Sequence, residues 1–138
     1  MLASQIPTKI SVPFASGAGG SYTRTVPIPS QIAITPGAAS FTDGFVPLNF
    51  APVGAGGTPP FGQDMNGLLN AITLWQQWQG AGGLVIYDSA MSTAIGGYPK
   101  GAMLASTTAG AAWLNTADNN TTNPDSSGVN WVAFAFAR

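Results

Sequence analysis

The sequence predicts a mixed α+β fold, mostly β and irregular, with an extended Pro/Gly-rich N-terminal arm, one central helix and a small antiparallel C-terminal β meander. Nine of the eleven prolines fall in the first sixty residues, one helical apolar periodicity follows them, and short apolar runs between turn residues fill the rest. We therefore divide the chain into residues 1–60 as the arm, 61–83 as the helix with a Gly-rich turn, and 84–138 as the β module.

The arm cannot form a helix of ordinary length, because each proline lacks an amide N–H and breaks helical hydrogen bonding. Its short alternating runs, residues 6–12, 22–28 and 31–34, can pair only as edge or isolated strands. The arm nevertheless carries too many apolar side chains for a linker in water. We expect it to lie against a surface, which is either its own core or a neighbouring subunit.

The helix is predicted to begin near residues 62–64 and to end at about Trp78 or Gln79. Asp64 stands where a carboxylate can accept hydrogen bonds from the free amides of the first turn. We therefore expect Asp64 to cap the helix. Gly80 follows the last periodic residue and supplies the stop.

Apolar side chains recur along this helix at i, i+3, i+7 and i+10, which places them on one face. Such a stripe is either an anchor of the chain's own core or a contact between symmetry-related helices. The opposite face is polar without being charged, and such side chains are buried in interfaces at lower cost than charged ones. The apolar stripe, our candidate oligomer interface, consists of Met65, Leu68, Leu69, Ile72, Trp75 and Trp78. The polar face consists of Asn66, Asn70, Thr73, Gln76 and Gln77.

The C-terminal module is predicted to contain three strands, at residues 102–106, 113–116 and 130–136. The last of these alternates apolar side chains on both faces, which is typical of a strand. A loop rich in Asn, Asp, Thr and Ser at residues 117–128 joins the second strand to the third. Residues 84–87 form either a short strand or the lead-in to a helix.

The composition excludes several classes of function. The 138 residues contain no cysteine, no histidine and no glutamate, so a thiol nucleophile, a disulfide, a Cys/His zinc site and a histidine base are impossible. The four Lys and Arg residues cannot supply the roughly 6 to 10 phosphate contacts of a nucleic-acid binder. The five aspartates lie far apart in the sequence, so we expect no enzyme.

The surface composition predicts a subunit of an assembly. Only 7% of the residues are charged while 45% are hydrophobic, against roughly 25% charged in an ordinary soluble domain. No run approaches the roughly 20 apolar residues of a membrane span, and residues 1–10 do not resemble a secretory signal. Disorder is disfavoured by the 10% aromatic content. We therefore expect neighbouring subunits to cover the apolar surface that has too few charges to be well solvated.

Two motifs suggest ligand sites, and both favour a structural interpretation. Gly-Ala-Gly-Gly occurs at residues 17–20, 54–57 and 80–83, without the flanking residues of a phosphate-binding loop, and so indicates turns or hinges. An oxygen-rich loop lacks the glycine and glutamate of a calcium loop, so we expect a hydrogen-bonded turn, no metal and no cofactor. Its oxygen-bearing side chains are Asp118, Asn120, Thr122 and Asp125.

Three aromatic side chains of the C-terminal module could stack on sugar rings beside Asn and Asp partners: Tyr98, Trp113 and Trp131. They are our candidate glycan contacts. The other interpretation is that so small a meander fills its core with these rings.

Several uncommon strings occur in a fixed order along the chain. They are residues 44–47, 56–67, 94–102 and 118–125, together with the two tryptophans Trp113 and Trp131. In that order they resemble a segment of tailed-bacteriophage and prophage tail fibre proteins, and the resemblance covers roughly residue 45 to the C-terminus. It implies a virion-proximal part of the fibre, made in the host cytoplasm, that joins the fibre to baseplate or tail-tip proteins and to a distal fibre chain, commonly as a homotrimer.

Residues 98–131 are also similar to small chitin-binding-type carbohydrate modules. We therefore hold two functional hypotheses. The first is a structural, homo-oligomeric component of a phage tail whose arm docks on the baseplate or tail tip. The alternative is a carbohydrate-binding module that contacts host surface glycans. Because the sequence stops at Arg138 rather than continuing into a shaft and tip, we expect a short adaptor or the upper segment of a fibre.

Overall fold

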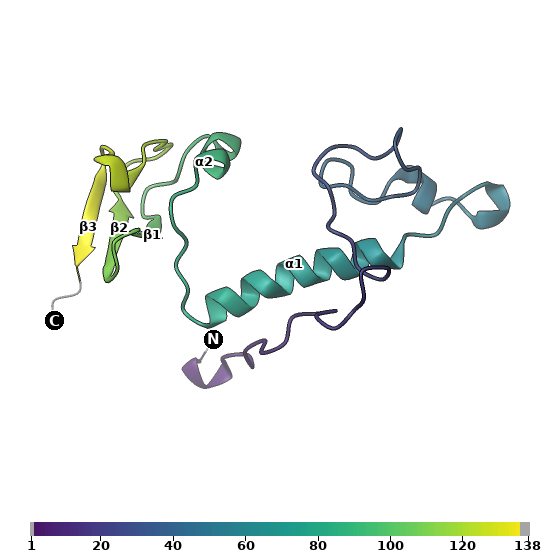
Figure 1. Cartoon of the computed structure of the whole chain (residues 1–138), viewed down its shortest axis with the longest axis horizontal. Helices are drawn as coiled ribbons and strands as arrows, with labels where there is room; N and C mark the ends of the chain where they lie inside the picture. Colours follow the sequence, from purple (N-terminus) through teal and green to yellow (C-terminus); the bar gives the residue numbers. More distant parts are fainter. Residues whose placement is uncertain (1, 136–138) are drawn as a thin grey trace. The chain divides into compact units, whose positions relative to one another are not determined.

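The computed structural model of the chain describes residues 2–135 and confirms the mixed α+β class (Figure 1). Its described residues form two α-helices and one three-stranded antiparallel sheet. The chain divides into two compact units, residues 1–81 and 82–138, which we call unit 1 and unit 2. The arm and the first helix, predicted as separate segments, both lie in unit 1.

Helix α1 (Gly62–Gly80) confirms the predicted central helix. Its end differs from the prediction, because Gly80 is still helical and is not the stop. The N–H of Ala81 donates to the Gln77 carbonyl at 3.0 Å, and Gly82 then adopts a φ of 84°. This left-handed conformation carries no steric penalty for glycine, so Gly82 is the residue that ends the helix.

Asp64 does not cap α1, which corrects the sequence prediction. It is 1% exposed, and its Oδ2 accepts from the N–H of Ala39 at 2.8 Å. Its Oδ1 lies 2.6 Å from Nη2 of Arg24, and that nitrogen also donates to the Ala39 carbonyl at 3.3 Å. A buried carboxylate needs such a charged partner. Asp64 therefore joins two distant parts of the arm to the start of the helix.

The arm contains no regular strand among residues 2–60, so the predicted runs 6–12, 22–28 and 31–34 form no ladder. The carbonyls of Pro27 and Ile28 still accept from the N–H groups of Phe41 and Thr42, at 2.9 and 3.2 Å. The prolines between and within them remove the amide donors that a ladder requires. Single turns of 3-10 helix form instead, and one isolated bridge joins Ser40 to Gly44. These single turns are Ala3–Gln5, Pro47–Asn49 and Val53–Ala55.

Unit 2 contains the predicted meander, with antiparallel strands in the order β1, β2, β3. The part of the third predicted strand at residue 136 lies outside the described residues. The strands are β1 (Met103–Ala105), β2 (Ala111–Asn115) and β3 (Trp131–Ala135).

Unit 2 also contains a second helix, α2 (Ser89–Ile95), which corrects the prediction of a single helix. Asp88 caps it by accepting from the N–H of Met91 at 2.9 Å, and Gly96 ends it with a φ of 76°. An Asp cap and a terminal glycine are both visible in the sequence. The seven-residue helix was missed because it is too short for an apolar periodicity to stand out.

One face of the sheet covers a core that is as much polar as apolar. Leu104 and Asn115 are 2% and 1% exposed, and the Asn115 Nδ2 donates to the carbonyls of Tyr98 at 3.0 Å and Ala117 at 2.7 Å. The Asn115 Oδ1 accepts from Nδ2 of Asn120 at 2.9 Å. This amide network fixes the loops around the sheet, where a larger domain would use apolar packing.

Candidate functional site

The polar face of α1 holds the N-terminal segment by its main chain. The Gln77 Nε2 donates to the carbonyl of Ser11 at 2.7 Å, and the Asn70 Nδ2 donates to that of Phe14 at 2.7 Å. The segment therefore runs antiparallel to the helix and lies beside it (Figure 1). We call residues 9–24 the strap.

The same pattern continues along the helix. The hydroxyl of Thr73 accepts from the N–H of Phe14 at 2.8 Å, and the Asn66 Nδ2 donates to the carbonyl of Tyr22 at 2.8 Å. The polar face was predicted to suit an interface, and its occupant is the chain's own strap. We call the side chains that bind it the polar stripe: Asn66, Asn70, Thr73 and Gln77.

The strap is fixed at its C-terminal end. The N–H of Arg24 donates to the Gln63 carbonyl at 3.1 Å, beside the ion pair with Asp64. A Cβ added at Gly67 would lie 1.7 Å from the Arg24 carbonyl oxygen, so only glycine lets the two backbones approach this closely. Sequence reasoning missed this anchor. Its signal was that Arg24 is one of only four cationic residues in the chain.

The apolar stripe of α1 is largely uncovered. Ile72 is 48% exposed, Trp75 57% and Trp78 51%, and α1 buries only Asp64 among its residues. At about 100° per residue, the four residues of the polar stripe lie within roughly 60° of one another, and the centre of this stripe is roughly 150° from that of the apolar stripe. The helix thus turns its polar side toward its own chain and its apolar side outward.

The spacing of the apolar stripe matches a helix-to-helix seam. Met65, Leu68, Ile72 and Trp75 alternate steps of three and four residues, which is the a/d spacing of a coiled coil. Leu68 is half-buried while Met65 is 42% exposed. Apolar side chains at this spacing can interlock with those of a second helix.

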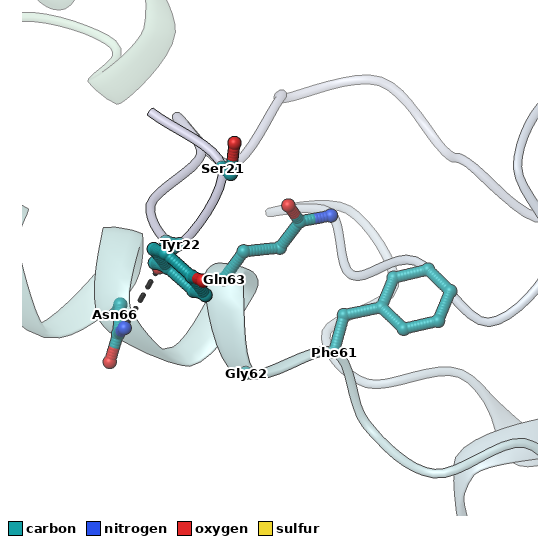
Figure 2. A pocket seen from close by; sticks show the side chains of 6 residues that line it. All are labelled: Ser21, Tyr22, Phe61, Gly62, Gln63 and Asn66. Carbon is teal, nitrogen blue, oxygen red and sulfur yellow. Dashed lines mark hydrogen bonds between the residues drawn. The ribbon is translucent and has the colours of Figure 1, made fainter. Parts of the chain in front are cut away.

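A shallow pocket of about 380 Å³ lies where the strap meets the start of α1. Figure 2 shows the Gln63 side chain between the rings of Tyr22 and Phe61, and the amide of Asn66 bonded to Tyr22. Tyr22 is 71% exposed, so the pocket is open to solvent on that side. Its lining residues are Ser21, Tyr22, Phe61, Gly62, Gln63 and Asn66.

Among the predicted glycan contacts, Tyr98 lies inside unit 2. It is 8% exposed, and its ring stands 5.6 Å from that of Tyr87 and 6.0 Å, edge to face, from that of Trp131. Its hydroxyl accepts from the N–H of Asp88 at 3.1 Å. Tyr98 therefore packs between other rings and joins the cap of α2 to the sheet.

The two tryptophans lie on the same face of the sheet and are half-buried, with their indole N–H groups bonded within the chain. The Trp131 Nε1 donates to the carbonyl of Thr122 at 2.8 Å. The Trp113 Nε1 donates to Oδ1 of Asp125 at 2.8 Å. Hydrogen bonds from the Ser106 hydroxyl and then from Trp113 lower the pKa of Asp125 below its ordinary value.

The oxygen-rich loop is a hydrogen-bonded turn in which side-chain oxygens accept from nearby donors. The Asn120 Oδ1 accepts from the Thr122 hydroxyl at 2.7 Å, and the Asp118 Oδ1 accepts from the Lys100 N–H at 3.0 Å. Residues 2–135 contain no group of three or more His, Cys, Asp or Glu side chains that could hold a metal ion.

A comparison with protein-family models finds none that matches this chain, and a comparison with curated proteins finds no similar sequence. Across the part of the chain that the structure describes, neither helix combines the length and the apolar character needed to cross a membrane.

Proposed function

We propose that this protein is a structural component of a phage tail that assembles as a homotrimer and joins the tail fibre to the baseplate or tail tip. The observation that carries the proposal is the inverted arrangement of α1, whose polar stripe is covered by the strap while its apolar stripe is exposed. A helix that is apolar outward needs a partner. A second and a third copy of the same helix satisfy that need with a self-complementary seam.

The energy available from such a seam is substantial. Full burial of one large apolar side chain contributes about 1.5–3 kcal/mol. Ile72, Trp75 and Trp78 are about half exposed in the single chain. Burying the exposed half of each side chain would therefore add about 1 kcal/mol. Three helices that bury these positions together therefore gain several kcal/mol.

The sparse charge supports the same proposal. The chain has four Lys or Arg residues and five Asp residues. Arg24 and Asp64 form an ion pair inside unit 1, and Asp125 accepts hydrogen bonds within unit 2. Few charges remain to keep single chains apart in water. A surface of this kind suits contacts with further subunits.

The assignment to a phage tail rests on the resemblance to tail fibre proteins, which includes the start of α1 and the aromatic framework of unit 2. In this proposal the arm contacts baseplate or tail-tip proteins, and unit 2 receives the distal fibre chain. Unit 2 offers an apolar surface for that role, since Met103 and Val132 share a sheet face and are 42% and 54% exposed.

Light scattering coupled to size-exclusion chromatography tests the assembly. We expect a trimer for the natural chain and a monomer for Ile72→Asp, because a carboxylate in the centre of the seam is buried without a partner. Phe50→Asp is the matched control, since Phe50 is apolar and 78% exposed but lies outside α1. A monomeric natural chain at micromolar concentration contradicts the proposal.

Binding to tails purified from the phage that encodes the chain tests the location. Deletion of residues 1–43 should abolish this binding, because the proposal places the contact with the tail in the arm.

The alternative, a carbohydrate-binding module, has less support from the geometry. Tyr98 is enclosed, and the indole N–H groups of Trp113 and Trp131 are bonded within the chain. A glycan array separates the two functions, because binding that disappears in Trp113→Ala with unit 2 still folded favours the module.

A further inference from the structure

The sheet of unit 2 has one edge that the chain covers and one that it leaves open (Figure 1). At the β1 edge, the N–H of Ala105 donates to the carbonyl of Val85 at 2.8 Å, so the segment before α2 covers part of that edge. At the β3 edge, the main chains of Trp131 and Ala133 have no such partner among residues 2–135. The fold therefore leaves β3 accessible to a further strand.

The register of the ladder identifies the groups of β3 that point outward. The N–H of Thr116 donates to the carbonyl of Asn130 at 2.8 Å, and bonded pairs alternate with unbonded pairs along an antiparallel ladder. Asn130 and Val132 therefore bond to β2, whereas the N–H and C=O groups of Trp131 and Ala133 point away from it. These outward backbone groups are the ones that a further strand can bond.

β3 lacks the features by which an edge strand usually prevents pairing with another chain. Such strands carry a charged side chain, a proline or a bulge. The sequence of β3 is Trp-Val-Ala-Phe-Ala, and its residues pair with β2 in unbroken register. Val132 and Phe134, which share one face of the sheet, are 54% and 44% exposed beside this edge. The edge is therefore both open and apolar.

The described part of the chain does not itself supply a strand for this edge. Residues 2–135 form three strands, and each already has its place in the sheet. Copies within a homotrimer cannot pair β3 with β3, because two identical edges pair through a two-fold axis, which a three-fold assembly lacks. In the proposed trimer, each open edge is therefore available to a strand of a different chain.

We propose that the open edge of β3 binds an extended, uncharged strand of the distal fibre chain, which adds a fourth strand to the sheet. This inference rests on the proposed function and specifies how unit 2 receives that chain. The added strand is recognised through its main chain, and every second side chain lies on the sheet face of Val132 and Phe134. Apolar side chains fit these positions, whereas a charged one would be covered without a partner.

A synthetic strand tests the edge. The probe is the peptide Thr-Val-Thr-Phe-Thr-Val-Thr with blocked ends, added to the whole chain while NMR follows the exchange of backbone amides. We expect the N–H groups of Trp131 and Ala133 to exchange about tenfold more slowly with the peptide bound, as an added hydrogen bond of ordinary strength predicts. Failure of the peptide to protect either amide overturns the proposal.

Methyl groups on the peptide nitrogens provide matched controls. When Val and Phe of the peptide lie on the face of Val132, the threonines are the residues that bond to β3. N-methylation of the threonines should therefore abolish binding, whereas N-methylation of the valines and the phenylalanine should leave it intact. Equal effects of the two modifications would overturn strand addition.

A substitution in β3 tests the same bonds from the protein side. Ala133→Pro removes one outward N–H, which a sheet edge tolerates, and should weaken peptide binding about tenfold. Ala133→Val keeps the N–H and should bind as the natural chain does. Unchanged binding by a folded Ala133→Pro variant overturns the proposal, and the methylated peptides decide the question if that variant does not fold.

Photocrosslinking on purified tails identifies the occupant. With a benzophenone side chain in place of Ala133, we expect a crosslink to an uncharged segment of a chain of different mass. A crosslink to β3 of a second copy, with a doubled mass in light scattering, overturns the proposal and leaves the tail assignment intact. A monomeric natural chain overturns the proposed trimer, whereas peptide binding at β3 would still support the strand-binding edge.

Discussion

The two units of this chain stabilise themselves in opposite ways. Unit 2 encloses its polar groups, since Asn115 and Asn120 bond to each other and to the surrounding loops. Unit 1 has a nineteen-residue helix with a single buried residue, Asp64, and its exposed side is apolar. Hydrogen bonds in its interior hold unit 2 together, whereas most of α1 in unit 1 is not covered by its own chain. In the proposed assembly, α1 therefore supplies the contacts between copies of the chain.

The largest effect is expected from Gly67→Val, which breaks unit 1. The added Cβ would lie 1.7 Å from the carbonyl oxygen of Arg24, so the arm must move away from the helix and separate Arg24 from Asp64. Breaking a buried ion pair in this way costs about 3–5 kcal/mol. Hydrogen exchange resolved by segment should show loss of protection in the arm and none in unit 2.

Gly62→Ala is the matched control in the same helix. No atom lies within 4 Å of a Cβ built there, so protection in the arm should be kept or slightly raised by the better helix propensity of alanine. Equal behaviour of the Gly67 and Gly62 variants would mean that the close approach at Arg24 does not hold the arm.

A smaller effect, in the other unit, is expected from Asn115→Asp. The change keeps the shape but removes the two N–H donors that serve the carbonyls of Tyr98, Pro99 and Ala117. A buried acceptor without a donor costs about 1–3 kcal/mol, so with three such carbonyls unit 2 should lose about 3 kcal/mol or more. Urea unfolding followed by hydrogen exchange measures the loss, and α1 should keep its protection.

Asn119→Asp is the control for this variant, because Asn119 is exposed and tolerates its φ of 53° as Asp does. If both Asp variants unfolded unit 2 equally, added charge rather than the lost amide would be the cause. If unit 1 unfolded together with unit 2, the two units would not be separate in stability.

The sequence predicted the elements whose signals are local. Alternation and turn residues located the sheet, and periodicity located α1 to within about a residue at each end. The same reasoning failed where the partner of a residue lies far along the chain. Asp64 has the position of a helix cap, but its partners Arg24 and Ala39 are brought to it only by the folded arm.

The candidate site likewise has features that the local sequence predicts and features that depend on distant residues. The polar and apolar faces of α1 follow from the spacing of the residues, but the spacing does not tell which face is covered. An uncharged amide can be covered at low cost when it is hydrogen-bonded, and it is equally stable in water. The strap resolved that choice through backbone groups, which carry no signature in the sequence. Tyr98 similarly has the residue type of a sugar contact, and only the positions of Tyr87 and Trp131 around it identify it as core.

The smallest expected effect is the dependence of stability on pH, which one aspartate in each unit allows us to compare between the units. Hydrogen bonds from Ser106 and Trp113 lower the pKa of Asp125 in unit 2, and those from Ser30 and Ser40 lower the pKa of Asp43 in unit 1. A carboxyl group whose pKa is lower in the folded chain stabilises it at pH 7. That contribution is lost below about pH 4, as the pH falls from the ordinary aspartate value through the lower folded one.

The indole N–H of Trp113 reports this titration directly, because it donates to Asp125 at 2.8 Å. Its NMR resonance should shift with a midpoint below pH 4 in the natural chain and should show no such step in Asp125→Asn. The variant should also flatten the acid dependence of unit 2 while unit 1, which keeps Asp43, retains its own. A midpoint at or above the ordinary aspartate pKa would mean that the hydrogen bonds to Asp125 are weaker in solution than the geometry indicates.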